Sequence, residues 1–182
     1  MAYAIELFFD PRAEAAVRAM WGNLEARGLR SMATTSHGQH RPHVSLVVAD
    51  RITRAQASAA TEPLGGAADL TLRLSSVAVF PGRSGVLYLS VVPTLRLLRL
   101  HHEIHARLVG SGVESGRHYL PDVWVPHCTL AQGLTQDEVT SAVRAVKRLR
   151  PVDADVVSVG VVDTDTGAVM TVAEPPHSRS AD

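Results

Sequence analysis

Two short segments of the chain share one pattern of residues that suits proton transfer. Pro42-His43-Val44-Ser45-Leu46 and Pro126-His127-Cys128-Thr129-Leu130 both read Pro-His-x-Ser/Thr-Leu. Histidines titrate near neutral pH, so one can act as a base while the other acts as an acid. A hydroxyl beside each can donate to the non-bridging oxygens of a phosphate, where charge gathers in the transition state. The pair predicts acid–base chemistry on a phosphodiester without a metal.

Alternation along a β-strand explains the spacing within each segment. Successive side chains point to opposite faces of a strand, so His43 shares a face with Ser45, and His127 shares a face with Thr129. Cys128 then turns away from His127. A buried free cysteine usually behaves as a small apolar residue, so we favour that interpretation over a nucleophilic thiol.

The elements that must position these strands follow one order in both halves of the chain. In the first half the patterns predict a strand, a helix starting at Asp10-Pro11 and ending near Gly28, and then a strand, a helix and a strand; the expected ranges are 3–9, 11–28, 43–49, 53–64 and 70–80. In the second half they predict a strand, a helix, a strand, a helix and two closing strands; the expected ranges are 86–92, 94–110, 127–131, 135–149, 156–162 and 168–172.

The spacing of equivalent residues indicates a duplication. Pro11 and Pro93 are 82 positions apart (93 − 11), Gly28 and Gly110 are also 82 apart (110 − 28), and the two histidines are 84 apart (127 − 43). We infer an α/β or α+β fold in which two β-α-β-α-β units form pseudo-symmetric lobes around a central cleft. The expected limits are a single bilobal domain over 1–173, with repeats at about 3–80 and about 85–172, and a disordered tail at 174–182.

The paired segments in such a chain resemble the 2H phosphoesterase superfamily, and most of all its bacterial 2′-5′ RNA ligase-like or cyclic phosphodiesterase branch. The resemblance covers about residues 3–172. It implies that His43 and His127 are the catalytic pair and that Ser45 and Thr129 hold the phosphate. It also implies a reaction without metal or cofactor on 2′,3′-cyclic phosphates, 2′-5′ linkages or related cyclic nucleotides. It selects neither a substrate nor hydrolysis over ligation.

The polar loops before the two segments supply candidate substrate contacts. His37, His40 and Arg41 precede the first segment, and Tyr119 and Trp124 precede the second. Polar loops beside catalytic strands often touch the ligand, and an aromatic side chain can stack on a nucleobase. The alternatives are a solvated loop for the first group and a packing role at the edge of the core for Trp124.

A second group of histidines lies within one expected helix. His101, His102 and His105 gather there, and His102-Glu103-Ile104-His105 is one residue short of the His-Glu-x-x-His zinc pattern. A solvated helix face is the favoured interpretation, so we expect no metal, and a metal hydrolase is a weaker alternative. Arg83, in a turn between two expected strands, is a weaker candidate for substrate contact.

The composition limits the class of partner. The 182 residues carry no formal net charge with histidine neutral, so a protein that coats nucleic acid by neutralising many phosphates is not expected. The single cysteine fits a reducing compartment, and no apolar run approaches the length of a membrane span. We expect a cytoplasmic monomer, without membrane contact, whose partner is a small nucleotide or an RNA end. The alternative is a module that binds the same ligands without turnover.

Overall fold

A computed structural model describes the chain except residues 1, 36, 66–69, 83, 148–149 and 174–182, so Arg83 and the expected tail lie outside the described residues. The elements in chain order are β1 (Tyr3–Phe9), α1 (Pro11–Glu25), β2 (His43–Ala49), α2 (Arg54–Gly65), β3 (Thr71–Phe80), β4 (Gly85–Val91), α3 (Leu95–Gly110), the 3₁₀ helix η1 (Arg117–Tyr119), β5 (His127–Leu134), α4 (Gln136–Val146), β6 (Val152–Asp163) and β7 (Val169–Ala173). The order β-α-β-α-β thus occurs twice before β7.

The strands form one antiparallel sheet in the order β2-β1-β6-β3-β4-β5, and β7 also pairs with β6. The long strand β6 joins its two parts, because Asp155 pairs with Thr71 of β3 and Val161 pairs with Ile5 of β1. The α+β class is therefore confirmed. The third strand of each half pairs with a strand of the other half: β3 pairs with β4, and β6 pairs with β1. The two predicted units therefore do not each form a sheet from their own strands alone. That the halves are repeats of one unit stays a prediction.

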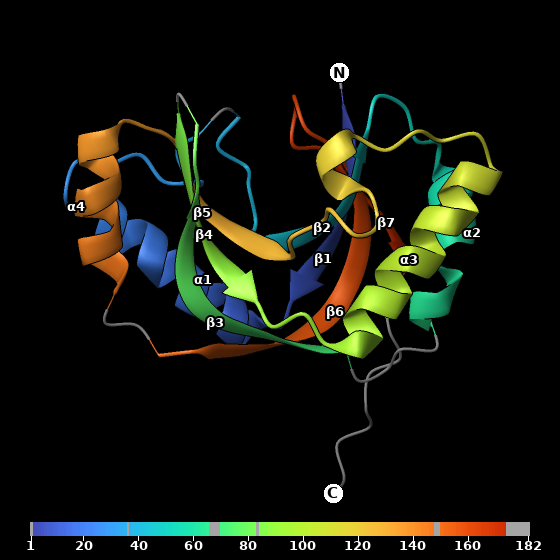
Figure 1. Cartoon of the computed structure of the whole chain (residues 1–182), viewed down its shortest axis with the longest axis horizontal. Helices are drawn as coiled ribbons and strands as arrows, with labels where there is room; N and C mark the ends of the chain where they lie inside the picture. The colour runs from blue at the N-terminus through green and yellow to red at the C-terminus, as the bar shows by residue number, and fades with distance from the viewer. Residues whose placement is uncertain (1, 36, 66–69, 83, 148–149, 174–182) are drawn as a thin grey trace, which may run out of the picture.

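The helices cover the sheet in two pairs, and each pair takes one helix from each half of the chain. The helix α1 packs with α4, and α2 packs with α3 (Figure 1). The amphipathic pattern of α1 explains its orientation, because Val17, Met20, Trp21 and Leu24 fall on one face and are buried in the core. Of the helices in the described part of the chain, none is long and apolar enough to cross a membrane.

The helix starts correct the spacing that the prolines suggested. Asp10 caps α1 by accepting from two backbone N–H groups, and Thr94 caps α3 in the same manner by accepting from Leu97. These caps are 84 positions apart (94 − 10), as the motif histidines are. Matching Pro11 to Pro93 was therefore wrong, because Pro11 lies inside its helix whereas Pro93 precedes the cap.

The helix ends give the same correction. Gly28 follows α1 with φ +72°, and Gly112 follows α3 with φ +80°, a region that favours glycine. These two glycines are also 84 positions apart (112 − 28). Gly110, the expected partner of Gly28, is still the last residue of α3. One offset of 84 therefore relates the caps, the helix ends and the histidines.

The strands that carry the two motifs lie at opposite ends of the strand order, yet the curvature of the sheet brings β2 and β5 into contact (Figure 1). The polar loops cross between the halves. Met32 donates its backbone N–H to Leu130 of β5 at 3.0 Å, and Gly116 donates to Val48 of β2 at 2.7 Å. Each edge strand is thus partly covered by the loop of the other half, and the starts of both strands meet in one region.

Candidate active site

The two motif histidines are the first residues of β2 and β5, and their rings are held in the same manner. The Nδ1 atom of His43 lies 2.6 Å from the carbonyl oxygen of Arg41, and Nδ1 of His127 lies 2.7 Å from that of Val125. A carbonyl oxygen only accepts, so Nδ1 must carry the proton in both rings. In both rings Nε2 is therefore the atom that can exchange a proton with a substrate, and Nε2 of His43 also lies 3.3 Å from Oε1 of Glu6.

The two imidazoles are near enough to affect each other's charge. Burial lowers the pKa of His127, the carbonyl of Val125 opposes this, and the nearby His43 lowers it further. The fold therefore brings together two rings that are 84 residues apart in the chain (127 − 43). A lowered pKa favours neutral His127, the form that can accept a proton.

Aromatic rings surround His127. Phe80 lies with its ring centroid 4.9 Å from that of His127 and Tyr88 at 5.2 Å, both edge-on, and these two aromatics stack on each other at 4.1 Å. Sequence reasoning missed both residues. The register of the β3–β4 hairpin, which pairs Ala78 with Tyr88 and Phe80 with Val86, brings them together, and hairpin register was not assigned from the sequence.

A cavity of about 570 Å³ opens beside His127. This volume lies in the range of sites for small organic ligands. Its lining includes His127, Thr129, Phe80, Tyr119, Val123 and Gln132. Two predicted site residues of the second half, Thr129 and Tyr119, therefore face the same space as the histidine, together with Gln132, which sequence reasoning missed.

An acidic side chain lies against His43. Oε1 of Glu6, from β1, is 3.3 Å from Nε2 of His43, and Glu6 is only 6% exposed. Burial raises the pKa of Glu6, and the neighbouring His43 opposes that rise. Sequence reasoning missed Glu6, although a carboxylate inside the apolar run of residues 4–9 was an available signal, since buried carboxylates are rare without a partner.

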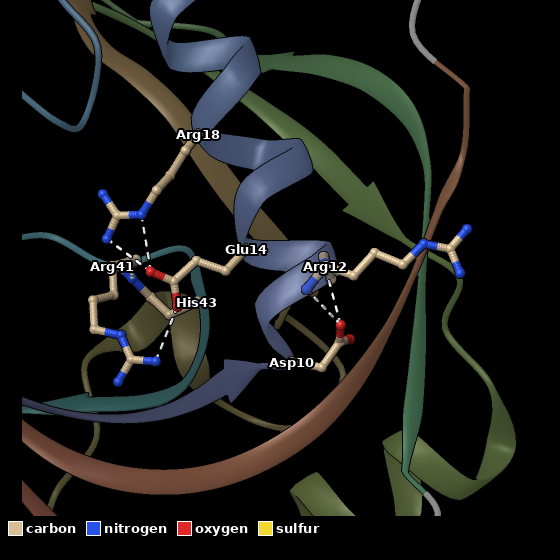
Figure 2. Close-up of polar contacts among 7 residues, drawn as sticks. Asp10, Arg12, Glu14, Arg18, Arg41 and His43 are labelled. Atoms are coloured by element: carbon tan, nitrogen blue, oxygen red, sulfur yellow. Dashed lines mark hydrogen bonds and ion pairs between the residues drawn. The ribbon is translucent and has the colours of Figure 1, made fainter.

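The Arg41 side chain is engaged on the protein rather than directed at a ligand. Figure 2 shows Glu14 of α1 between Arg18 and Arg41, with an Arg41–Glu14 ion pair of 3.0 Å. The Arg41 guanidinium also lies over the Phe8 ring, 4.7 Å from its centroid. Burial would raise the pKa of Glu14, but hydrogen bonds from Arg41 and Arg18 lower it overall. The structure therefore favours a supporting role for Arg41 over the predicted substrate contact.

The two motif hydroxyls have different surroundings. The Ser45 hydroxyl lies in hydrogen-bonding contact with the Tyr119 side chain, and burial raises the pKa of that tyrosine. The Ser45 carbonyl oxygen accepts from Nε1 of Trp124 at 3.1 Å. Thr129 lines the open cavity. Tyr119 thus links the two halves of the site, because it contacts Ser45 and also faces the cavity beside His127.

Trp124 belongs to the core, and this changes its expected role. It is 7% exposed, and its ring stacks on His101 with centroids 4.1 Å apart and planes within 7°. His101 in turn contacts the carbonyl oxygens of Leu46 and Tyr119, each at 3.1 Å from Nε2. Burial, above all, lowers the pKa of His101 to about 4. The structure therefore supports the packing alternative for Trp124 rather than stacking on a nucleobase.

The predicted histidines of the first loop pack against each other, with ring centroids 4.1 Å apart for His37 and His40. His37 also packs closely on Gly167, in the turn between β6 and β7. Burial, followed by the proximity of His37 and His43, lowers the pKa of His40 to about 4. His40 therefore lies within electrostatic range of the site, whereas His37 is occupied by the turn.

Two alternatives from the sequence find no support in this geometry. Cys128 is 1% exposed, and burial raises the pKa of its thiol to about 12, so a thiolate nucleophile is disfavoured. The Nε2 atom of His101 is occupied by backbone carbonyls. Within the described ranges, no group of three His, Cys, Asp or Glu side chains is placed to hold a metal ion.

The family model described as the 2′-5′ RNA ligase superfamily matches residues 9–168, which include both motifs. The chain belongs to the 2′-5′ RNA ligase superfamily. A search of curated protein sequences gave no significant match.

Two solved structures show that the fold of this superfamily member is shared. E. coli LigT, in a crystal structure with 3′-AMP, has a TM-score of 0.53 and 12% identity, with 93% of this chain and 91% of that chain covered. Usb1 of Kluyveromyces marxianus, in a structure with uridine monophosphate, has a TM-score of 0.51 and 14% identity, with 94% and 96% covered. At such identities the likeness concerns the fold alone.

Proposed function

We propose that this superfamily member is a metal-independent phosphodiesterase for 2′-linked or 2′,3′-cyclic phosphodiesters of nucleotides or RNA ends. His43 and His127 exchange protons with the attacking and departing oxygens, and Ser45 and Thr129 hold the phosphate. The observation that carries the proposal is the matched anchoring of both rings through Nδ1, together with the proximity of the two imidazoles.

A phosphate fits this arrangement for electrostatic reasons. A phosphodiester carries one negative charge, and the proposed mechanism sets against it one protonated imidazole together with hydroxyl donors from Ser45 and Thr129. Both hydroxyls stand two residues beyond a histidine on the same strand face, so each imidazole has a donor beside it. Donors fixed on strands stabilise developing charge without reorganising, which lowers the barrier.

The cavity beside His127 suits a nucleoside. Phe80 supplies an aromatic surface, Val123 adds an apolar one, and Gln132 supplies amide donors and acceptors. Nucleobases stack on aromatic rings and are read by a few polar groups. The structures of LigT with 3′-AMP and of Usb1 with uridine monophosphate support a nucleotide as the ligand.

The test is a substrate panel with purified protein in EDTA. The panel contains 2′,3′-cyclic mononucleotides and 2′-5′ and 3′-5′ dinucleotides, and the position of the product phosphate is determined by ³¹P NMR. His43→Ala and His127→Ala are each expected to lower kcat/KM by about 10²- to 10⁴-fold. His102→Ala, on an exposed position of α3, serves as the matched control.

Full activity in the doubly substituted protein would exclude the proposal. Tight binding of these ligands with no product after long incubation would instead favour the alternative of a module that binds without turnover. Retained circular dichroism and an unchanged melting temperature would show that losses in the variants come from chemistry and not from unfolding.

A further inference from the structure

A second hollow of about 330 Å³ adjoins the cavity beside His127. Val86 and Gln132 line both spaces, so the two meet at these residues. The other residues that line the second hollow are Arg30, Thr35, Ser84 and Gly133. A ligand that occupies the first cavity therefore has room to extend into a space that lies beyond the motif histidines.

A β-bulge shapes the boundary between the two spaces. In the pairing of β4 with β5, Gln132 and Gly133 stand together opposite the single residue Val86. Bulges redirect side chains and are frequent beside active sites. Gly133 has φ +77°, and a Cβ built on it would lie 3.6 Å from Nη2 of Arg30 and 3.9 Å from Oγ of Ser84. Two hydrogen-bond donors from distant segments therefore border the same space over Gly133.

Buried neighbours hold the backbone of Arg30 against β5. Leu29 and Met32 are 7% and 5% exposed, and Met32 donates its backbone N–H to Leu130 at 3.0 Å. The Arg30 residue between them is exposed. A loop of the first half thus brings a guanidinium to the rim of the cavity of the second half and fixes its backbone through core contacts.

Arg30 supplies a positive charge that its surroundings leave largely uncompensated. Of the described residues, none forms an ion pair with Arg30. The pKa of Glu138 is lowered mainly by hydrogen bonds from Thr135 and further by the charge of Arg30. Glu138 is itself engaged at the start of α4, where its Oε2 accepts from the backbone N–H of Thr135 at 2.7 Å. The guanidinium can therefore bind an anion that enters the second hollow.

Phosphate is the anion that this set of donors suits. Arginine pairs strongly with phosphate oxygens, and hydroxyl and amide side chains such as those of Ser84 and Gln132 add neutral donors. A nucleoside in the first cavity carries its reacting phosphate on the 2′ or 3′ oxygen, toward the motif histidines. Its other phosphate is attached to the 5′ oxygen, at the opposite end of the ribose.

We propose that Arg30, Ser84 and Gln132 bind the phosphate on the 5′ oxygen of the nucleoside whose 2′,3′ end reacts. The substrate is then a 5′-phosphorylated nucleotide or an RNA end rather than a nucleoside cyclic phosphate alone. The inference rests on the proposed function and narrows its substrate class. All three residues are exposed, so a strand that continues from the 5′ phosphate can pass into solvent. The contact contributes binding energy away from the reacting atoms.

Three substrates separate the 5′ phosphate from the rest of the ligand. They are uridine 2′,3′-cyclic phosphate, the same compound phosphorylated at its 5′ oxygen, and the dinucleotide in which a second uridine is joined through that phosphate. The unaltered protein is expected to show about tenfold higher kcat/KM on the second and third than on the first. Arg30→Ala should lose this gain and change kcat/KM on the first by at most about twofold.

Two further variants make the result specific. Arg27→Ala is the matched control, because Arg27 is an exposed arginine nearby whose guanidinium donates to the carbonyl of Asn23 at 3.2 Å, and it should keep the gain. Ser84→Glu places a carboxylate beside Arg30 without removing it and should lose the gain. Equal losses of Arg30→Ala on all three substrates would reduce Arg30 to a structural role and overturn the inference.

The two phosphorylated substrates distinguish the sources of the phosphate. A gain that both share and that Arg30→Ala abolishes supports recognition of the phosphate alone. A gain confined to the dinucleotide and abolished by Arg30→Ala supports the diester of an RNA end. A gain on the dinucleotide that persists in Arg30→Ala would come from the second nucleoside and would overturn the inference.

Calorimetry keeps this inference separate from the proposed function, because it needs no turnover. Uridine 3′,5′-bisphosphate should bind with a Kd about tenfold lower than that of 3′-UMP, and only when Arg30 is present. If the substrates react but the 5′ phosphate changes neither kcat/KM nor Kd, the inference is overturned while the proposed function stands. If nothing reacts and the bisphosphate still binds more tightly through Arg30, the proposed function fails while the phosphate site is supported.

Discussion

The carbonyl oxygen of Arg41 lies 2.6 Å from Nδ1 of His43, so the backbone of Arg41 sets the orientation of that imidazole. The guanidinium of the same residue is paired with Glu14 of α1 (Figure 2). The first helix is therefore connected to the first motif histidine through one arginine. Support of this kind outside the reacting groups commonly determines how well a site is ordered.

Loosening this support should lower turnover more than binding. Glu14→Ala removes the partner of the Arg41 guanidinium, and we expect kcat to fall about fivefold with little change in KM, because small misplacements of a reacting group are costly. Steady-state kinetics on the best dinucleotide of the panel provide the measurement. Arg18→Ala keeps the Glu14–Arg41 pair and is the control; an equal fall in that variant would contradict the prediction.

The matched anchoring of both rings predicts one tautomer for the neutral form of each histidine. Because Nδ1 donates to a carbonyl in both motifs, neutral His43 and neutral His127 should carry their proton on Nδ1. Two-bond ¹H–¹⁵N correlation spectra of ¹⁵N-labelled protein above pH 8 distinguish the tautomers by nitrogen shift. A proton on Nε2 of either ring would show that the anchoring is absent in solution.

The pH dependence should reflect the aromatic surroundings of His127. Burial lowers the pKa of His127 from the ordinary 6.5, which suits this histidine to act as the base. A base must be neutral, so activity should fall as pH falls through the pKa of His127. The acidic limb of kcat/KM should therefore lie below pH 6.5. Phe80→Ala exposes the ring and should move the limb to higher pH, whereas Tyr88→Phe keeps an aromatic ring and should leave it in place. An unmoved limb in Phe80→Ala would refute this account.

Folding stability should depend on His101. Burial, above all, lowers its pKa from 6.5 to about 4, so the unfolded chain binds the proton more readily between these values. The free energy of unfolding should therefore fall as pH falls from about 6.5 to about 4. The full shift in the pKa of His101 would correspond to about 3 kcal/mol in the free energy of unfolding. Because solvent screens part of this effect, we expect a change of about 1–2 kcal/mol.

Urea denaturation at several pH values measures this dependence. His101→Gln keeps a donor for the carbonyls of Leu46 and Tyr119 but cannot take up a proton, so it should flatten the slope. The slope should not vanish, because the pKa of His40 is also lowered to about 4, mainly by burial. His102→Gln, on the exposed face of α3, should change the slope only slightly, because the charge of His102 contributes least to the lowered pKa of His101.

The sequence was informative where function depends on local pattern. The double motif, strand alternation and capping signals predicted both motif strands, the order of the elements and the orientation of Cys128, because each depends on neighbours in the chain. Even so, the spacing of the prolines suggested an offset of 82 rather than 84, since Pro11 and Pro93 stand at different positions relative to their helix caps.

What the sequence could not predict depends on contacts between distant residues. Glu6 meets His43 only because β1 pairs with β2 in a register that contains a bulge. The ring of Trp124 is covered by His101 from α3, a contact that nothing near Trp124 in the sequence indicates. The exchange of β3 and β6 between the halves could not be predicted either, because identical strand patterns allow either partner.

Because of that exchange of strands, neither half of the chain can form its sheet without the other half. A protein cut between residues 80 and 85 would yield two fragments that each lack a strand paired with their own strands in the intact protein and one helix of each packed pair. Neither fragment could retain even half of the catalytic centre, and the two would have to reassemble before either histidine was held in place. The continuity of one peptide chain therefore supplies the local concentration that two separate pieces would have to obtain by meeting in solution.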